Sequence, residues 1–303
     1  MPSGPTSSSS RSLTELATLV GEPRLAPATR LELGQTIGRY TLERWLGAGA
    51  MGVVYAARDL LLDRMVALKV LHPHQRGAVG AQRLQREARA LARLSHPNVV
   101  TVHDVGISGG RLYLAMELVD GQTLAGWLAK GPRSWSEVLA VMIRAGQGLA
   151  AVHDAGLVHR DFKPDNVMLT ADGRVLLADF GIAQVEGDPP ARDPTEAAAG
   201  EPTGEGGLMA PELGTPRYMA PEQFLGAAID PRTDQFSFCV TLWEALLGTH
   251  PFCRGSLAEI ALAVTRGDRR GAPARHGLPP RVLRAIERGL STDPERRHPS
   301  MRA

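Results

Sequence analysis

The sequence predicts an α+β protein of two lobes, a small β-rich lobe with one main helix followed by a larger α-helical lobe. Two observations lead to this prediction: strand-like segments dominate up to Leu118, and helical spacing of apolar residues dominates after Gly121. The chain has 303 residues, of which 43% are hydrophobic and 22% charged, so it can bury a sizeable core.

Residues 1–36 are predicted to be a disordered tail. The serine run from Ser7 to Ser10 and the scattered Pro and Gly residues supply too little apolar surface for a core, although 13–20 could form a short helix. The folded domain is expected at residues 37–303, with the β-rich lobe at about 37–119 and the helical lobe at about 120–303.

Strands are predicted in the first lobe wherever short apolar runs are rich in β-branched and aromatic residues. Between them, Leu84, Ala88, Leu91 and Leu94 repeat at helical spacing, and the sequence His96-Pro97-Asn98 ends this pattern. The predicted elements are strands at 40–46, 53–57, 65–71, 99–105 and 112–118, and a helix at 82–94.

The second lobe is predicted to contain long helices and one small hairpin. The first helix ends at Gly156, a residue suited to a helix C-terminus, and the hairpin turns at Ala171-Asp172-Gly173. Residues 184–213 are poor in apolar residues and are predicted to be a mobile loop. The predicted elements are helices at 136–155, 233–248, 257–265 and 281–290, and strands at 167–169 and 175–178.

The charge and the cysteines exclude several classes of protein. A net charge of +2 gives no general attraction to nucleic acid or membranes, and the arginines between Arg266 and Arg284 are interpreted as a solvated basic face. Cys239 and Cys253 have no metal-binding spacing and are expected to be reduced thiols. No secretory signal and no apolar run of about 18 residues is present. We therefore expect a cytoplasmic chain without a membrane segment, although one could follow Ala303.

A glycine-rich pattern, G-x-G-x-x-G-x-V, begins at Gly47 and continues through Gly49 and Gly52. Dinucleotide-binding folds use the same glycine spacing, but there a strand leads into a helix. Here Val53 and Val54 follow, so the pattern predicts a loop that joins two strands. Glycines in such a loop allow backbone amides to approach phosphate oxygens without collisions from Cβ atoms.

Lys69 lies within an apolar strand, and Glu87 lies on the helix that follows. A lysine in such a strand is usually an exposed residue. If Glu87 pairs with it, the ammonium group is held in place to bind two phosphates of a nucleotide.

The residues 159–166, His-Arg-Asp-Phe-Lys-Pro-Asp-Asn, carry the strongest signal. Asp161 and Asn166 are spaced to place a carboxylate and an amide on one tight loop, and Asp179-Phe180-Gly181 follows a short hairpin. Asp161 can accept a proton from a hydroxyl nucleophile, while Asn166 and Asp179 can hold a metal ion that bridges phosphates. These residues together predict phosphoryl transfer.

These motifs, in this order, resemble the eukaryotic-like (Hanks-type) protein kinases, particularly the bacterial serine/threonine branch. The resemblance covers Tyr40–Ala303. It implies the bilobal protein-kinase fold, with ATP and Mg²⁺ (or Mn²⁺) as cofactors and proteins as substrates. It gives no indication of a nucleic-acid partner.

The resemblance also implies roles for individual residues. Asp161, Lys163, Lys69 and Glu87 would be catalytic, and Asn166 and Asp179 would bind the metal. Arg160, Glu222, Asp234 and Arg297 would be structural, with Glu222 paired to Arg297 and Asp234 bracing the catalytic loop. The expected ATP-binding residues, with Met116 as gatekeeper, are Leu46, Gly47, Gly49, Gly52, Val54, Ala67, Lys69, Met116, Glu117, Val119 and Met168.

In this family, a lysine at the position of Lys163 and a threonine at the position of Thr215 are typical of kinases that phosphorylate serine and threonine. The chain departs from the family pattern at Phe162 and Cys239, which replace leucine and glycine and are interpreted as packing changes. The closing tetrapeptide occurs twice, and the copy at 219–222 is assigned because Gly-Thr-Pro precedes it. The last helix of the family's domain is missing or cut short before Ala303.

Arg160 precedes the catalytic aspartate, and such kinases commonly need a negative charge on the activation loop to neutralise this arginine. The candidate acceptors before Gly214 are Thr195 and Thr203, and Thr215 lies just beyond. Two hypotheses stay open: autophosphorylation of Thr203, with self-association for transfer between copies, or a permanent charge from Glu205 or Glu212.

Three other functions compete with this interpretation. A pseudokinase typically lacks the residues equivalent to Lys69, Asp161 or Asp179, and all three are present. A small-molecule phosphotransferase generally lacks the peptide-docking segment from Gly214 to Glu222. A P-loop ATPase is excluded because no G-x-x-x-x-G-K-[ST] run occurs.

Overall fold

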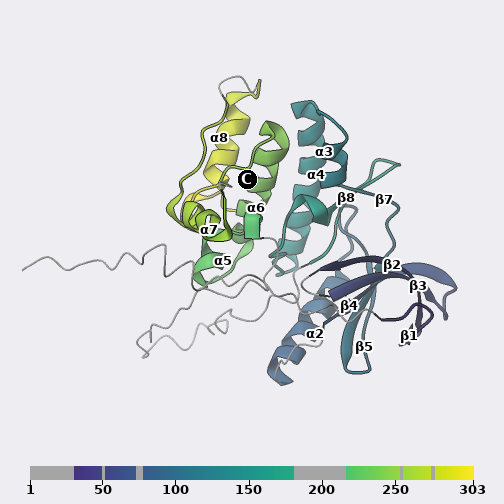
Figure 1. The fold of residues 1–303 in the computed structure, drawn as a ribbon. Coiled ribbons are helices and arrows are strands. Elements are labelled where there is room, and N and C mark those ends of the chain that lie inside the picture. Colours follow the sequence, from purple (N-terminus) through teal and green to yellow (C-terminus); the bar gives the residue numbers. More distant parts are fainter. Residues whose placement is uncertain (1–30, 50–51, 73–77, 181–215, 253–254, 274–276) are drawn as a thin grey trace, which may run out of the picture.

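The computed structural model describes residues 31–49, 52–72, 78–180, 216–252, 255–273 and 277–303. These residues form two lobes, one built mainly of strands β1–β6 and the other mainly of helices (Figure 1). The predicted two-lobe α+β architecture is confirmed.

The first lobe is a six-stranded antiparallel sheet in the order β1-β2-β3-β4-β6-β5. One face carries an apolar cluster that includes Tyr40, Tyr55 and Leu68, each at most 1% exposed. Helix α2 covers the other face, where Ala88 and Leu91 pack with Leu71 of the sheet. The bounds are β1 Thr36–Ile37, β2 Tyr40–Gly49, β3 Gly52–Asp59, β4 Arg64–Leu71, α2 Ala78–Arg93, β5 Val102–Ser108 and β6 Arg111–Glu117.

The predicted boundary of the tail at residue 36 is wrong, because residues 31–36 belong to the first lobe. The amide of Gly34 donates to the carbonyl of Leu42, and the amide of Leu42 donates back to Gln35. The amide of Leu31 donates to the hydroxyl of Tyr55 at 2.9 Å. Composition alone did not reveal these bonds, because it carries no information on which backbone groups pair.

The second lobe is built around helix α6 (Figure 1). Buried residues lie on all sides of this helix, as expected for a helix at the centre of a core. Its elements are β7 Gly121–Thr123, α3 Leu124–Ala129, α4 Trp135–Asp154, η1 Pro164–Asn166, β8 Val167–Thr170, β9 Val175–Leu177, η3 Pro216–Tyr218, α5 Pro221–Leu225, α6 Pro231–Leu247, α7 Leu257–Arg266, α8 Pro280–Gly289 and η4 Pro294–Arg296.

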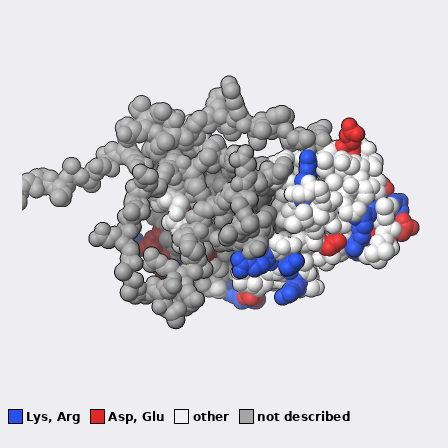
Figure 2. Space-filling model, turned by 90° about the horizontal axis from the view of Figure 1, so that it is seen from below, with Lys and Arg blue, Asp and Glu red and all other residues white. Residues whose placement is uncertain are grey.

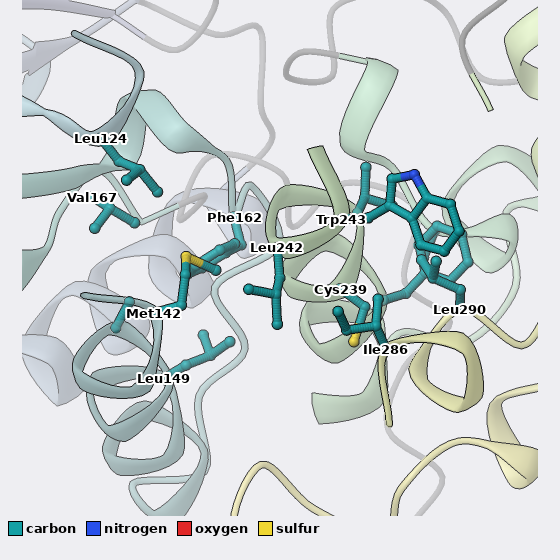
Figure 3. Packing of buried hydrophobic residues seen from close by; sticks show 14 of the residues in the cluster. Leu124, Met142, Leu149, Phe162, Val167, Cys239, Leu242, Trp243, Ile286 and Leu290 are labelled. Atoms are coloured by element: carbon teal, nitrogen blue, oxygen red, sulfur yellow. The ribbon is translucent and has the colours of Figure 1, made fainter. Parts of the chain in front are cut away.

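The core of this lobe connects α6 to the loop at residues 159–166 (Figure 3). Phe162 is fully buried and its ring lies 5.4 Å from that of Phe238 on α6. Burial of a phenylalanine side chain stabilises a fold by about 1.5–3 kcal/mol. Phe162 therefore anchors the loop that carries Asp161, which agrees with its interpretation as a packing change.

Charged side chains of both signs lie near one another on the described part of the face in Figure 2, where most of the surface is neither acidic nor basic. Among the described residues, no helix combines the length and the apolar character needed to cross a bilayer.

Candidate active site

Asp161 lies at the centre of a small polar cluster. Its Oδ2 atom accepts hydrogen bonds from Nζ of Lys163 at 2.8 Å and from Nδ2 of Asn166 at 3.2 Å. The same Asn166 nitrogen also donates to the backbone carbonyl of Asp161 at 2.7 Å. The predicted spacing thus brings the carboxylate, the ammonium group and the amide together on one loop.

Asp234 of α6 holds the backbone of this loop. Its buried carboxylate accepts hydrogen bonds from the amides of His159 and Arg160, both at 2.7 Å, and from Nε2 of His153 at 2.8 Å. Arg160 has φ +68°, a left-handed conformation that is unfavourable for a residue with a side chain. The charge-assisted hydrogen bonds that Asp234 accepts from these amides stabilise this conformation.

The ring of His159 is buried and connects this loop to the segment before Asp179. Its Nδ1 accepts from the amide of Asp161 at 3.3 Å, so the proton lies on Nε2, which donates to the carbonyl of Ala178 at 3.0 Å. Burial lowers the pKa of His159, which keeps the ring neutral. Phe180 packs against this ring at 4.9 Å.

Lys69 of β4 and Asp179 form an ion pair that joins the two lobes. The Nζ atom lies 3.2 Å from Oδ1 of Asp179. The positive charge of Lys69 lowers the pKa of Asp179, with a further contribution from the hydrogen bond between them. Asp179 is therefore ionised at neutral pH, the state in which a carboxylate binds a cation.

The expected pairing of Lys69 with Glu87 is not formed. Among the ion pairs of the described residues, Lys69 pairs with Asp179. The carboxylate of Glu87, on α2, lies 3.9 Å from the guanidinium of Arg160. The choice of partner depends on where α2 lies against the sheet, which the spacing of the sequence does not determine.

The residues expected to hold the nucleotide lie largely on one face of the first sheet. Register places Val54 opposite both Gly47 and Lys69, and Ala67 opposite Met116. Paired residues point to the same face, as do residues two apart in a strand, so these side chains share one surface. The remaining predicted positions are Leu46 in β2, Gly49 at its end, Val119 after β6 and Met168 in β8.

Two of these positions have a structural role that the motif did not reveal. A Cβ atom at Gly52 would overlap the carbonyl oxygen of Val70, so this glycine is required for close packing of β3 on β4. The amide of Glu117 donates to the carbonyl of Thr101 at 2.9 Å, so only its carbonyl could meet an adenine ring. By contrast, Cβ atoms at Gly47 and Gly49 would meet no atom within 4 Å.

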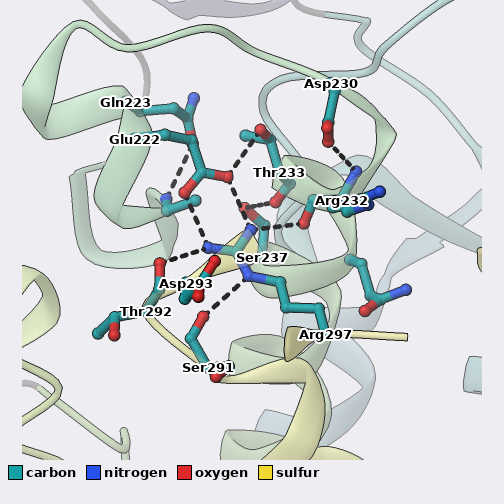
Figure 4. Close-up of polar contacts among 12 residues, drawn as sticks. Glu222, Gln223, Asp230, Arg232, Thr233, Ser237, Ser291, Thr292, Asp293 and Arg297 are labelled. Carbon is teal, nitrogen blue, oxygen red and sulfur yellow. Dashed lines mark hydrogen bonds and ion pairs between the residues drawn. The ribbon is translucent and has the colours of Figure 1, made fainter. Parts of the chain in front are cut away.

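The expected ion pair between Glu222 and Arg297 is present and fully enclosed (Figure 4). Two parallel hydrogen bonds of 2.7 and 2.8 Å join the guanidinium to the carboxylate, and the hydroxyl of Thr233 adds a third at 2.8 Å. The sequence did not indicate Thr233 or Gln223. Gln223 lies beside this pair and reaches the carbonyl of Arg160 at 3.0 Å.

The donors near Asp179 suit a magnesium ion. All hydrogen bonds of the Asn166 side chain to described residues use its nitrogen, which leaves its amide oxygen for a cation. Carboxylate and amide oxygens are ligands that Mg²⁺ prefers, together with phosphate oxygens. The described residues contain no cluster of three or more His, Cys, Asp and Glu side chains.

Three predicted residues, Thr195, Thr203 and Thr215, lie outside the described residues, as do Glu205 and Glu212.

Comparisons with known proteins agree with this geometry. The protein kinase domain family matches residues 40–302. The chain is 38% identical over 272 residues to serine/threonine-protein kinase pkn2 of Myxococcus xanthus, which covers 86% of this chain and 31% of that protein. It is 34% identical over 267 residues to PknE of Mycobacterium tuberculosis, which covers 88% of this chain and 44% of that protein.

The chain thus spans less than half the length of these two relatives. A solved structure, the PknI kinase domain of Mycobacterium tuberculosis, superposes with a TM-score of 0.64 at 34% identity, over 90% of this chain and 96% of that one. The family match and this superposition both cover nearly all of the described residues. The chain therefore belongs to the protein kinase domain family.

Proposed function

We propose that this chain transfers the γ-phosphoryl group of ATP to serine and threonine hydroxyls of protein substrates, as the names of two of its relatives, both serine/threonine-protein kinases, suggest. The observation that carries the proposal is the carboxylate of Asp161, which Lys163 and Asn166 contact on a loop braced by buried Asp234.

In the proposed mechanism Asp161 orients the substrate hydroxyl and accepts its proton. Lys163, 2.8 Å from that carboxylate, places a positive charge where the transferring phosphoryl group gathers negative charge. A bound magnesium ion would neutralise phosphate charge at Asp179 and Asn166. The protein's own contribution is to hold these groups in place before the substrates arrive.

We further propose that the nucleotide lies on the sheet face formed by Val54, Ala67, Lys69 and Met116. Lys69 would then contact phosphate oxygens, and Glu87 would leave Arg160 to hold it. A negative charge on the activation loop, from phosphorylated Thr203 or from Glu205 or Glu212, would take the place of Glu87 at Arg160. Transfer between two copies of the chain would supply the phosphate.

ATP supply argues for a cytoplasmic catalytic domain, and the same chemistry would serve a longer protein tethered to a membrane. The main competing function is a nucleotide-binding pseudokinase. The retained ion pair between Lys69 and Asp179 supports the catalytic proposal over this alternative.

The test is incubation with labelled ATP and Mg²⁺, with and without a generic basic protein, for the wild type and Asp161→Asn. Asp172→Asn, an exposed carboxylate in the turn between β8 and β9, is the matched control. We expect label on serine or threonine, lowered about 10²-fold or more in Asp161→Asn and retained in the control. Tight ATP binding without any transfer would favour the pseudokinase.

A further inference from the structure

Gln223, on α5, joins two parts of the molecule that are far apart in sequence. Its side chain is buried, with 6% of the residue exposed. Its Oε1 atom accepts a hydrogen bond from the amide of Ala220 at 2.9 Å, and its Nε2 atom donates to the carbonyl of Arg160 at 3.0 Å. Both ends of one amide are therefore used, and their chemistry fixes which end is oxygen.

The bond to Arg160 acts on the peptide group directly before Asp161. The carbonyl of Arg160 and the amide of Asp161 belong to one planar unit. Gln223 holds the carbonyl, and Nδ1 of His159 accepts from the amide at 3.3 Å. This plane is therefore held at both edges, and its orientation determines where the side chain of Asp161 points.

The local backbone makes this support necessary. Arg160 has φ +68°, a conformation that persists only where the surroundings hold it. Asp234 holds the amide of Arg160, but it makes no bond to the carbonyl. Gln223 donates the hydrogen bond to the carbonyl of Arg160.

The other end of Gln223 is attached to a rigid anchor. Ala220 directly precedes α5. The second residue of this helix, Glu222, forms two hydrogen bonds with Arg297. Ala220 lies in the segment from Gly214 to Glu222, which the family resemblance associates with docking of the peptide substrate. Gln223 thus connects the substrate-docking segment to the catalytic base.

We propose that Gln223 is a positioning residue that sets the orientation of Asp161 for phosphoryl transfer; this inference rests on the proposed kinase function. The competing explanation is that Gln223 only caps α5, because its Oε1 atom accepts from the amide of Ala220, the residue that precedes the helix, as the third helical residue does in one half of a capping box. Glutamate caps a helix in this way as well as glutamine does. Glutamate cannot donate to the carbonyl of Arg160 while ionised, so one substitution separates the two roles.

The experiment compares the wild type with Gln223→Glu and Gln223→Met in matched phosphorylation states. Gln223→Glu keeps the cap and places a carboxylate against a carbonyl oxygen, whereas Gln223→Met removes both bonds. The control is Glu137→Gln, which exchanges acid and amide in the exposed capping box of α4. Measured quantities are kcat, KM for ATP, and amide hydrogen exchange of residues 157–163.

We expect kcat to fall about tenfold or more in both Gln223 variants, because a buried hydrogen bond is lost. KM for ATP should stay within about twofold of the wild-type value, since Gln223 lies on α5 and is not one of the residues proposed to bind the nucleotide. Exchange of residues 157–163 should accelerate in both variants and not in Glu137→Gln.

A pH profile gives a further check. A protonated glutamic acid can donate to the carbonyl of Arg160, so the activity of Gln223→Glu relative to wild type should recover as pH falls, while that of Gln223→Met should not. Unchanged kcat and unchanged exchange in Gln223→Glu would overturn the inference. If the wild type transfers no phosphate, the proposed function fails, and hydrogen exchange alone still decides whether Gln223 holds the loop.

Discussion

The carboxylate of Glu87 lies 3.9 Å from the guanidinium of Arg160, and Arg160 directly precedes Asp161, the proposed catalytic base. Lys69 meanwhile lies 3.2 Å from Asp179. Glu87 is thus paired with Arg160 in this structure, whereas the family resemblance pairs it with Lys69. A negative charge that binds Arg160 would shift the balance toward Lys69.

We expect Arg160→Gln to uncouple activity from the charge of the activation loop, because the neutral amide cannot hold Glu87. Phosphatase treatment should lower the rate of the wild type about tenfold or more and change the rate of Arg160→Gln by less than about threefold. Initial rates before and after treatment measure this, with mass spectrometry of Thr195, Thr203 and Thr215. A fully active wild type with an unmodified loop would instead assign the charge to Glu205 or Glu212.

The pair between Glu222 and Arg297 should be the most costly ion pair to break. We expect Arg297→Met to lower the free energy of unfolding by about 3–5 kcal/mol, since it leaves a buried carboxylate without its partner. The double variant Glu222→Gln/Arg297→Met should lose less than the sum of the single changes. It should not return to the wild-type value, because Arg297 also donates to the carbonyls of Arg232 and Ser291.

Urea unfolding of the four proteins measures this coupling. The exposed pair of Arg174 with Glu117 offers a comparison, and breaking it should cost about 1 kcal/mol or less. Additive losses at Glu222 and Arg297 would contradict the argument.

Most of the fold and the centre of the site were predictable from the sequence, because both are encoded locally. Asp161, Lys163 and Asn166 lie within one short loop, so their spacing alone brings them together. The long helices were found within a few residues of their ends. For α4 the start was placed at Ser136, whereas Ser134 and Glu137 form the capping box that begins the helix at Trp135.

The features that escaped prediction depend on contacts between distant segments. The bond from Gln223 to Arg160 spans 63 residues and leaves no periodic signal. The partner of Lys69 depends on how α2 packs on the sheet. Short elements such as α3, at Leu124–Ala129, were missed because six residues carry too little periodicity.

Stability should fall as pH drops below about 6.5, the ordinary pKa of histidine. Burial lowers the pKa of both His159 and His250, so the folded state stays neutral while the unfolded chain takes up protons. Each histidine then contributes a slope of at most about 1.4 kcal/mol per pH unit between 6.5 and its own lowered pKa, and the loss stops below that lowered pKa.

The ring contacts explain this sensitivity. Nδ1 of His250 accepts from the amide of Phe252 at 3.2 Å, and Nε2 donates to the carbonyl of Arg217 at 2.7 Å. Protonation of Nδ1 would place its N–H group against the backbone N–H group of Phe252. We expect His250→Gln, which can still donate to Arg217, to reduce the drop in unfolding free energy between pH 7.5 and 5.5. An identical drop in wild type and variant would assign the pH dependence to other groups.

The final prediction concerns the contact between α6 and α8, where Cys239 faces Gly289 (Figure 3 shows Cys239 beside Ile286 of α8). The thiol of Cys239 is buried, which raises its pKa to about 12 and leaves it unreactive. A Cβ atom at position 289 would overlap the sulfur of Cys239, whereas the Cβ of Cys239 would lie 3.4 Å away. Glycine at 289 therefore compensates for the side chain at 239.

A double-mutant cycle tests this compensation. In the wild type, Gly289→Ala should lower the free energy of unfolding by about 1–3 kcal/mol, because the added methyl group overpacks the contact. In a Cys239→Ala background the overlap with sulfur is gone, and Gly289, the last residue of α8, has no positive φ that would penalise alanine. Gly289→Ala should then be neutral or stabilising, with a coupling of at least about 1 kcal/mol in urea unfolding. Equal costs in the two backgrounds would show that some other contact, and not the sulfur of Cys239, requires glycine at position 289.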